Sequence, residues 1–182
     1  MEKQRARQTG LSARAAITSE QRAAYDAALL VRIKAIAQNA SLIGCYVSMK
    51  DEADTHAFLN WCFQTCRSIA VPKVEGKTLG FYQISSMDEL APGVFGVLEP
   101  LRSHRTDPAK IDLMFIPLSS FDHHLNRTGY GKGYYDSVLT ESMHKVGIAY
   151  PEQQVEEIDA DPWDIPLDEI ILPDSQLKRC II

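Results

Sequence analysis

Residues 111–139 read IDLMFIPLSSFDHHLNRTGYGKGYYDSVL. The first six residues are almost all apolar and Pro117 ends the run, which is typical of a buried strand in a parallel sheet. At the far end, residues 134–143 carry apolar side chains at helical spacing and predict a helix. The segment therefore predicts a strand, a long loop and a helix, which is a repeating unit of α/β folds.

The loop between these two elements ends in three glycines, Gly129, Gly131 and Gly133. Glycine lets the backbone approach a ligand closely, and a helix N-terminus offers unpaired N–H groups to an anion. Arg127 and Lys132 add positive charge beside the glycines. The spacing fits neither the Walker A loop nor the dinucleotide-binding fingerprint. The loop alone therefore indicates either a phosphate site or a plain strand–turn–helix corner.

Composition and length favour one ordinary globular domain, residues 1–182, because 45% of the residues are hydrophobic and 24% are charged. The net charge of −5 gives no support to nucleic-acid binding. No apolar run reaches the roughly 18 residues of a membrane span, so no membrane partner is expected. The polar, basic N-terminus does not fit a secretory signal, and a cytoplasmic location is expected.

Apolar patterns along the rest of the chain predict alternating helices and strands. Thr18 and Gln21 form a capping-box pattern at the start of a helix that reaches about residue 40, and a second helix follows Asp54 or Thr55. Strands are predicted at residues 41–47, 68–72, 78–84, 145–150 and 169–172. The polar residues 101–110 suggest an exposed connector. This alternation predicts an α/β fold with a largely parallel sheet, in which the segments after the strands share one crevice.

The longer string at residues 121–136 resembles the signature of the 5-formyltetrahydrofolate cyclo-ligase family. That signature usually reads Phe-Asp-x-x-Gly-x-Arg-Leu-Gly-x-Gly-x-Gly-Tyr-Tyr-Asp. Two positions depart from it, because Leu125 stands where a glycine is usual and Thr128 where a leucine is usual. The segment at residues 96–100 also looks like a Gly-Ile-x-Glu-Pro stretch of the family. The resemblance covers nearly the whole chain.

The resemblance implies a single-domain three-layer α/β sandwich, similar to ribose-phosphate isomerases and CoA-transferases. It implies ATP-dependent conversion of 5-formyltetrahydrofolate to 5,10-methenyltetrahydrofolate by a monomer or weak homodimer. Two alternatives stay open. One is a folate- or nucleotide-binding paralogue without activity, in which Leu125 and Thr128 mark lost loop geometry. The other is an enzyme like the sugar-phosphate isomerases, which rests on fold analogy alone.

The resemblance also assigns site residues. ATP is expected to contact an N-terminal pair and the glycine loop, namely Lys3, Arg7, Arg127, Thr128, Gly129, Tyr130, Gly131, Lys132, Gly133, Tyr134 and Tyr135. The folate is expected to contact Val47, Glu52, Tyr130, Gly131, Lys132, Gly133 and Tyr134. Arg127, Lys132 and Tyr134 are the expected catalytic residues. From pattern alone, residues 1–16 suggest a frayed, solvated terminus, and Glu52 suggests an acid that stabilises a helix dipole.

A magnesium site is expected between Asp136 and a second aspartate near the last strand. An aspartate beside a bound triphosphate would repel it unless a cation intervened, and Mg²⁺ binds through one or two carboxylates plus phosphate oxygens. Asp164 matches the family's second position best, with Asp168 as the runner-up. From pattern alone, residues 159–168 suggest an acidic surface loop broken by prolines, and Asp136 suggests an acid in the first turn of a helix.

Overall fold

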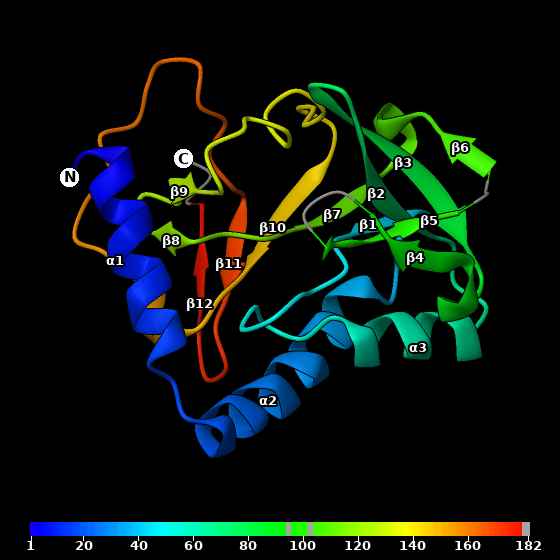
Figure 1. Cartoon of the computed structure of the whole chain (residues 1–182), viewed down its shortest axis with the longest axis horizontal. Helices are drawn as coiled ribbons and strands as arrows, with labels where there is room; N and C mark the ends of the chain where they lie inside the picture. The colour runs from blue at the N-terminus through cyan, green and yellow to red at the C-terminus, as the bar shows by residue number, and fades with distance from the viewer. Residues whose placement is uncertain (94–95, 102–103, 180–182) are drawn as a thin grey trace.

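The computed structural model describes residues 1–93, 96–101 and 104–179. Within them, eight strands form one sheet in the order β12-β11-β10-β7-β1-β2-β3-β6 (Figure 1). Neighbours from β11 to β2 are parallel, and the pairs toward both edges are antiparallel. The bounds are β1 Ile43–Cys45, β2 Ile69–Glu75, β3 Thr78–Ile84, β6 His104–Thr106, β7 Leu113–Ile116, β10 His144–Ile148, β11 Glu169–Ile171 and β12 Gln176–Lys178. The predicted α/β class with a largely parallel sheet is confirmed.

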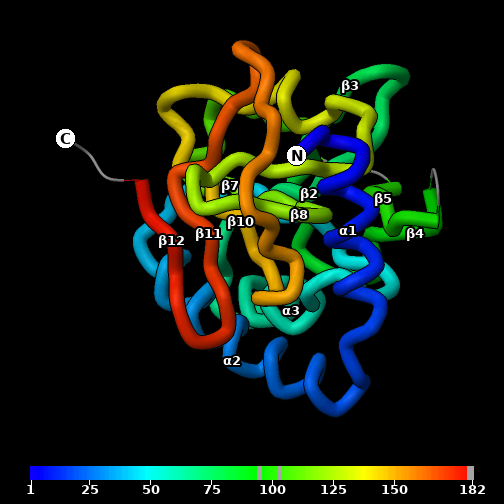
Figure 2. Tube along the Cα trace, turned by 90° about the vertical axis from the view of Figure 1, so that its left-hand side faces the viewer, coloured from blue at the N-terminus to red at the C-terminus, as the bar shows by residue number. Residues whose placement is uncertain are grey.

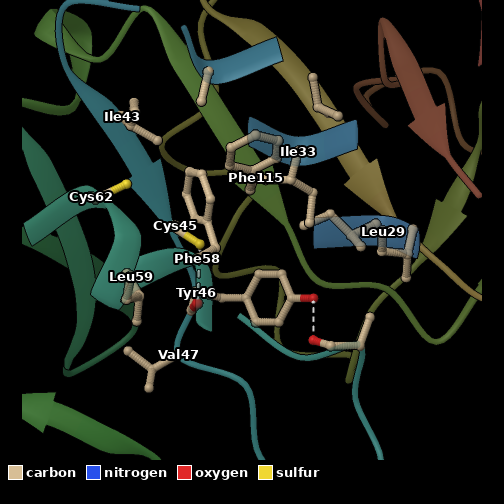
Figure 3. Packing of buried hydrophobic residues seen from close by; sticks show 14 of the residues in the cluster. Leu29, Ile33, Ile43, Cys45, Tyr46, Val47, Phe58, Leu59, Cys62 and Phe115 are labelled. Carbon is tan, nitrogen blue, oxygen red and sulfur yellow. Dashed lines mark hydrogen bonds between the residues drawn. The ribbon is translucent and has the colours of Figure 1, made fainter. Parts of the chain in front are cut away.

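Helices α2 (Ser19–Ala37) and α3 (His56–Gln64) cover one face of the sheet. Figure 3 shows their apolar side chains against β1 and β7, with the ring of Phe58 edge-on to Phe115 at a centroid distance of 5.2 Å. The predicted cap of α2 is confirmed, because the Thr18 hydroxyl accepts a hydrogen bond from the Gln21 N–H at 3.2 Å. For α3, the Asp54 carboxylate accepts from the first two N–H groups of the helix.

Loops and short elements cover the opposite face. Their buried side chains, which include Leu118, Phe121, Leu125 and Leu167, pack against β7 and β11. The chain also has the short strands β4 Leu90–Pro92, β5 Leu98–Pro100, β8 Ser120–Phe121 and β9 Arg127–Thr128, and the 3₁₀ turns Met87–Glu89, Pro108–Lys110 and Pro151–Gln153. Of these, Met87, Leu90 and Leu98 pack against the core on the side of α2 and α3. β8 and β9 form a ribbon that carries the glycine loop out of β9.

The N-terminal helix α1 (Lys3–Ala15) packs along this ribbon, as Figure 2 shows for α1 and β8. Ala6 is fully buried, and a Cβ on Gly10 would lie only 2.1 Å from the Ser119 carbonyl oxygen. The prediction of a frayed terminus is therefore wrong. None of the helices in the described residues combines the length and apolar character needed to cross a membrane.

Two local predictions are also wrong. Residues 134–138 form turns and no α-helix, because a single turn is enough to bury Leu139 and to bury Tyr135 and Val138 in part before the chain turns toward β10. Within the predicted connector, β6 pairs with β3 as an edge strand, which does not need an apolar sequence when one edge faces solvent. Arg102, part of that connector, lies outside the described residues.

Candidate functional site

Two adjoining cavities, of about 390 Å³ and about 510 Å³, share one wall. The first lies between α1, the glycine loop and residues 163–165. The second lies where β1 and β2 end, as expected for a parallel sheet. The shared wall consists of Pro117, Tyr130, Lys132, Tyr134 and Tyr135. The segments after β1 and β7 and the second half of β2 therefore meet in one crevice. The alternation of helices and strands predicted such a shared crevice.

The first cavity is lined by cationic side chains from two distant parts of the chain. Lys3 and Arg7 come from α1, and Arg127 and Lys132 come from the ribbon and the glycine loop. The Nε of Arg7 donates a hydrogen bond to the carbonyl oxygen of Gly129 at 2.5 Å. This bond fixes α1 to the loop and keeps the Arg7 guanidinium inside the cavity.

The glycine loop needs glycine at Gly131 for two reasons. Its φ is +81°, and a Cβ there would lie 3.1 Å from the Arg7 guanidinium carbon. Gly133 also has a positive φ, +66°. Because no helix follows the loop, the expected anion site at a helix N-terminus is not formed, and the loop backbone and the cations are what remains for an anion. The hydroxyl of Thr128 is already engaged, 2.6 Å from the Ser120 hydroxyl in the protein interior.

Two of the three candidate metal ligands line the first cavity. Asp136 accepts a hydrogen bond from Arg127 at 2.7 Å, and Asp164 pairs with Lys3. Asp168 lies outside the cavity and pairs with the buried Lys145 at 2.9 Å, so it is less suited to bind a metal. The described residues contain no cluster of three or more His, Cys, Asp or Glu side chains that could hold a metal by itself. Two carboxylates suit Mg²⁺, which takes its other oxygens from phosphates and water.

The second cavity is mainly apolar and contains a buried carboxylate, Glu52. Only 7% of Glu52 is exposed, and it accepts hydrogen bonds from the Tyr130 hydroxyl at 2.7 Å and the Met49 N–H at 3.0 Å. Burial raises the pKa of Glu52, while these two hydrogen bonds and the charge of Arg14 oppose that rise. The carboxylate bonds to none of the α3 N–H groups, which Asp54 caps, so the geometry gives no support to the helix-dipole reading.

Two tyrosines of the shared wall, Tyr130 and Tyr135, are neutral at physiological pH. Burial and the nearby Glu52 raise the pKa of Tyr130 to about 12. Burial also raises the pKa of Tyr135 well above its ordinary value. Neither tyrosine therefore acts as a base, and Tyr130 already donates its single hydroxyl proton to Glu52. Tyr134 also lines both cavities.

A family model described as the 5-formyltetrahydrofolate cyclo-ligase family matches residues 1–173. The chain belongs to this family. A mouse 5-formyltetrahydrofolate cyclo-ligase is 27% identical, with 88% of each chain covered. The enzyme of that name from Haemophilus influenzae is 31% identical over 74% of this chain and 77% of its own length.

Solved structures of 5,10-methenyltetrahydrofolate synthetases are also similar. The NMR structure from Aquifex aeolicus superposes with a TM-score of 0.87 at 28% identity and covers 99% of this chain and 96% of its own. The structure from Mycoplasma pneumoniae has a TM-score of 0.78 at 27% identity, over 95% of this chain and 99% of its own. The fold of this cyclo-ligase family member is thus that of its relatives.

The structure adds two lining residues that were not among the expected site residues of this cyclo-ligase family member. Trp163, 75% exposed, lies at the rim of the first cavity beside Asp164, and Glu99 lines the second. Trp163 had a usable signal, because a tryptophan in an acidic, proline-rich loop is unusual for a solvated segment. Leu125, at the family's usual glycine position, has a φ of +67°. The loop therefore keeps the backbone conformation that a glycine would adopt there.

Proposed function

We propose that the chain catalyses the ATP- and Mg²⁺-dependent cyclisation of 5-formyltetrahydrofolate to 5,10-methenyltetrahydrofolate, with release of ADP and phosphate. The observation that carries this proposal is the shared wall, at which a cationic cavity and an apolar cavity with a buried carboxylate meet. A reaction that joins a phosphate donor to a folate needs two such cavities in contact. The two small molecules are the only partners in this proposal.

ATP occupies the first cavity in this proposal. Lys3, Arg7, Arg127 and Lys132 offset the charge of the triphosphate, and amides of the loop from Thr128 to Tyr135 donate to its oxygens. Electrostatic complementarity supports this placement, because the two carboxylates in the cavity are paired with Arg127 and Lys3. Arg7 and Lys132 have no carboxylate partner among the described residues.

The folate occupies the second cavity, whose volume is in the range of small-molecule sites. Val47 offers apolar contact to the pterin. Glu52 accepts hydrogen bonds from the pterin's exocyclic amine and ring N–H, which are donors that suit a carboxylate. The residues of the shared wall and the glycine loop, Tyr130 to Tyr134, then contact both ligands.

The chemistry joins the two ligands at the shared wall. The formyl oxygen attacks the γ-phosphorus of ATP, and the bond to the ADP oxygen breaks. N10 of the folate then attacks the activated formyl carbon and loses its proton to solvent, the five-membered ring closes, and phosphate leaves with the former formyl oxygen. Arg127 and Lys132 neutralise the charge on the transferred group, and Tyr134 orients the reacting groups. Catalysis by positioning and charge neutralisation is typical of phosphoryl transfer.

Asp136 and Asp164 are the residues that would hold a Mg²⁺ ion. When bound, the ion would supply positive charge beside the phosphates. Their carboxylates line the same cavity and supply the hard oxygen donors that Mg²⁺ prefers. In the unliganded protein, Arg127 and Lys3 balance the two charges.

A turnover assay tests the proposal. Protein, 5-formyltetrahydrofolate, ATP and Mg²⁺ are mixed, and methenyltetrahydrofolate is followed by its absorbance in the near ultraviolet. The proposal predicts product only when ATP is present. Saturable folate binding without product, under conditions in which a known cyclo-ligase is active, would instead support a binding protein without activity.

A further inference from the structure

Arg14 is a buried arginine that lines neither cavity. It lies in the last turn of α1 and is only 3% exposed. Its Nη2 donates to the Asp51 carboxylate at 3.0 Å and lies 3.1 Å from the Tyr130 hydroxyl oxygen. A buried guanidinium needs such partners, because an unpaired buried charge is costly. Arg14 therefore connects α1 to the loop after β1 and to the glycine loop.

Tyr130 extends this connection to Glu52. Its hydroxyl accepts from Arg14 and donates to the Oε1 of Glu52 at 2.7 Å. The positive charge of Arg14 favours the ionised form of Glu52, whereas Asp51 disfavours it. The other titratable groups that interact with Glu52 are the buried hydroxyls of Tyr46 and Tyr135.

We infer that Arg14 is a positioning residue for the folate cavity, which holds Tyr130 against Glu52 and keeps Glu52 an ionised acceptor for the pterin. This inference rests on the proposed folate site. Arg14 contacts neither ligand and acts only through Tyr130 and Glu52. Helix α1 then serves both cavities, because its first half brings Lys3 and Arg7 to the nucleotide and its last turn brings Arg14 to the folate site.

A double-mutant cycle tests the inference. The Kd of 5-formyltetrahydrofolate is measured by calorimetry for the wild type, Arg14→Gln, Glu52→Gln and the double variant. Each single substitution should weaken binding about tenfold or more, and the double variant should be within about threefold of Glu52→Gln, because residues in one network are not additive. Independent effects that multiply in the double variant would overturn the inference.

Arg22→Gln is the matched control. Arg22, on α2, donates to the carbonyl oxygens of Asp51 and Arg14 and therefore anchors the same segments, but it contacts neither Tyr130 nor Glu52. Arg22→Gln should lower the melting temperature and leave the folate Kd within about twofold of the wild-type value, since the substitution removes only contacts that anchor these segments. Folate binding that weakens as much as in Arg14→Gln would show that general loosening explains both, and the inference would be wrong.

The pH dependence supplies a second readout. Without the Arg14 charge, Glu52 binds a proton more readily, so the affinity of Arg14→Gln for folate should decline at a higher pH than that of the wild type. Arg14→Lys retains the charge and should restore the wild-type pH profile, and it carries this test if Arg14→Gln does not fold. An Arg14→Gln profile equal to that of the wild type, or an Arg14→Lys profile that differs from it, would contradict the inference. A wild type that binds no folate would instead refute the proposed function.

Discussion

Glu52, the proposed acceptor for the pterin, carries a cost to stability. Burial raises the pKa of Glu52, so the folded chain binds the carboxyl proton more tightly than the unfolded chain does. The contribution of Glu52 to stability therefore falls as the pH rises from the pKa of the unfolded chain to that of the folded chain. Glu52→Gln mimics the protonated form. At pH 7 to 8 its melting temperature should therefore equal or exceed that of the wild type.

The same substitution should weaken folate binding by about 1–3 kcal/mol, the loss expected when a charged hydrogen bond is removed. The KM for ATP should change little, because Glu52 lines only the second cavity. Calorimetry with 5-formyltetrahydrofolate and thermal melts measure both effects. A lower melting temperature with unchanged folate affinity would identify Glu52 as a structural residue.

Leu125 carries a left-handed backbone that its side chain disfavours by about 1–2 kcal/mol. Its side chain is 4% exposed in the core, which compensates for that cost. Leu125→Ala and Leu125→Gly should both be less stable, since both lose the buried side chain. Leu125→Ala should be the less stable of the two by about 1 kcal/mol, because only glycine adopts this φ freely.

Urea unfolding measures the order of the two variants. The matched control is Leu118, which is also buried but has no positive φ. There, the alanine variant should be more stable than the glycine variant. The same order at both positions would mean that the backbone at Leu125 is not strained.

Substitutions at Asp136 and Asp164 test the proposed metal site. Asp136→Asn and Asp164→Asn should each raise the Mg²⁺ concentration that gives half the maximal rate, because each removes a ligand charge. Asp168→Asn is the control, since Asp168 pairs with Lys145 and lies outside the cavity. It should lower stability and leave the Mg²⁺ requirement unchanged.

The alternative for Asp136 is that it only fixes Arg127, which donates to it at 2.7 Å. In that case Asp136→Asn would raise the KM for ATP at saturating Mg²⁺, and the Mg²⁺ requirement would stay where it is in the wild type. That outcome would remove Asp136 from the metal site.

At the scale of elements, α1 depends on the close approach of Gly10 to Ser119. Gly10→Ala improves helix propensity by about 1 kcal/mol but places a methyl group against a backbone carbonyl, which should lower stability by about 1–3 kcal/mol overall. The KM for ATP should also rise, because a displaced α1 withdraws Lys3 and Arg7. Melting curves and ATP saturation curves measure the two effects.

Thr9→Ala is the matched control for Gly10→Ala. Thr9 precedes Gly10 on α1 and is exposed, so alanine gains helix propensity there without a clash. Its stability should be equal or higher and its KM for ATP unchanged. If both variants behave alike, the packing of Gly10 does not position the cationic residues.

Elements with a clear apolar or β-branched pattern can be predicted from the sequence, and elements without such a pattern cannot. β3 was found at residues 78–84 because its apolar and β-branched residues lie between turn signals. α1 was missed because its buried face consists of Ala6, Gly10 and Arg14, which form no apolar stripe. The helix predicted at residues 134–143 failed because helical spacing over one turn also describes a buried turn.

At the scale of the whole molecule, the alternation of helices and strands predicted that segments at the ends of the parallel strands meet, because parallel strands end at the same edge of the sheet. The hydrogen bonds of Arg14 to distant segments could not be predicted. Arg14, Tyr130 and Glu52 are widely separated in the chain, and only the packing of α1 against the ribbon brings them together.

In the proposed reaction, the contact between the two cavities lets oxygen pass from the folate to the transferred phosphate. The decisive measurement uses 5-formyltetrahydrofolate labelled with ¹⁸O in the formyl group, with ATP and Mg²⁺, and mass spectrometry of the released phosphate. If the formyl oxygen attacks the γ-phosphorus at the shared wall, each phosphate carries one ¹⁸O atom. Formation of methenyltetrahydrofolate with unlabelled phosphate would contradict the proposed reaction and the role of the shared wall.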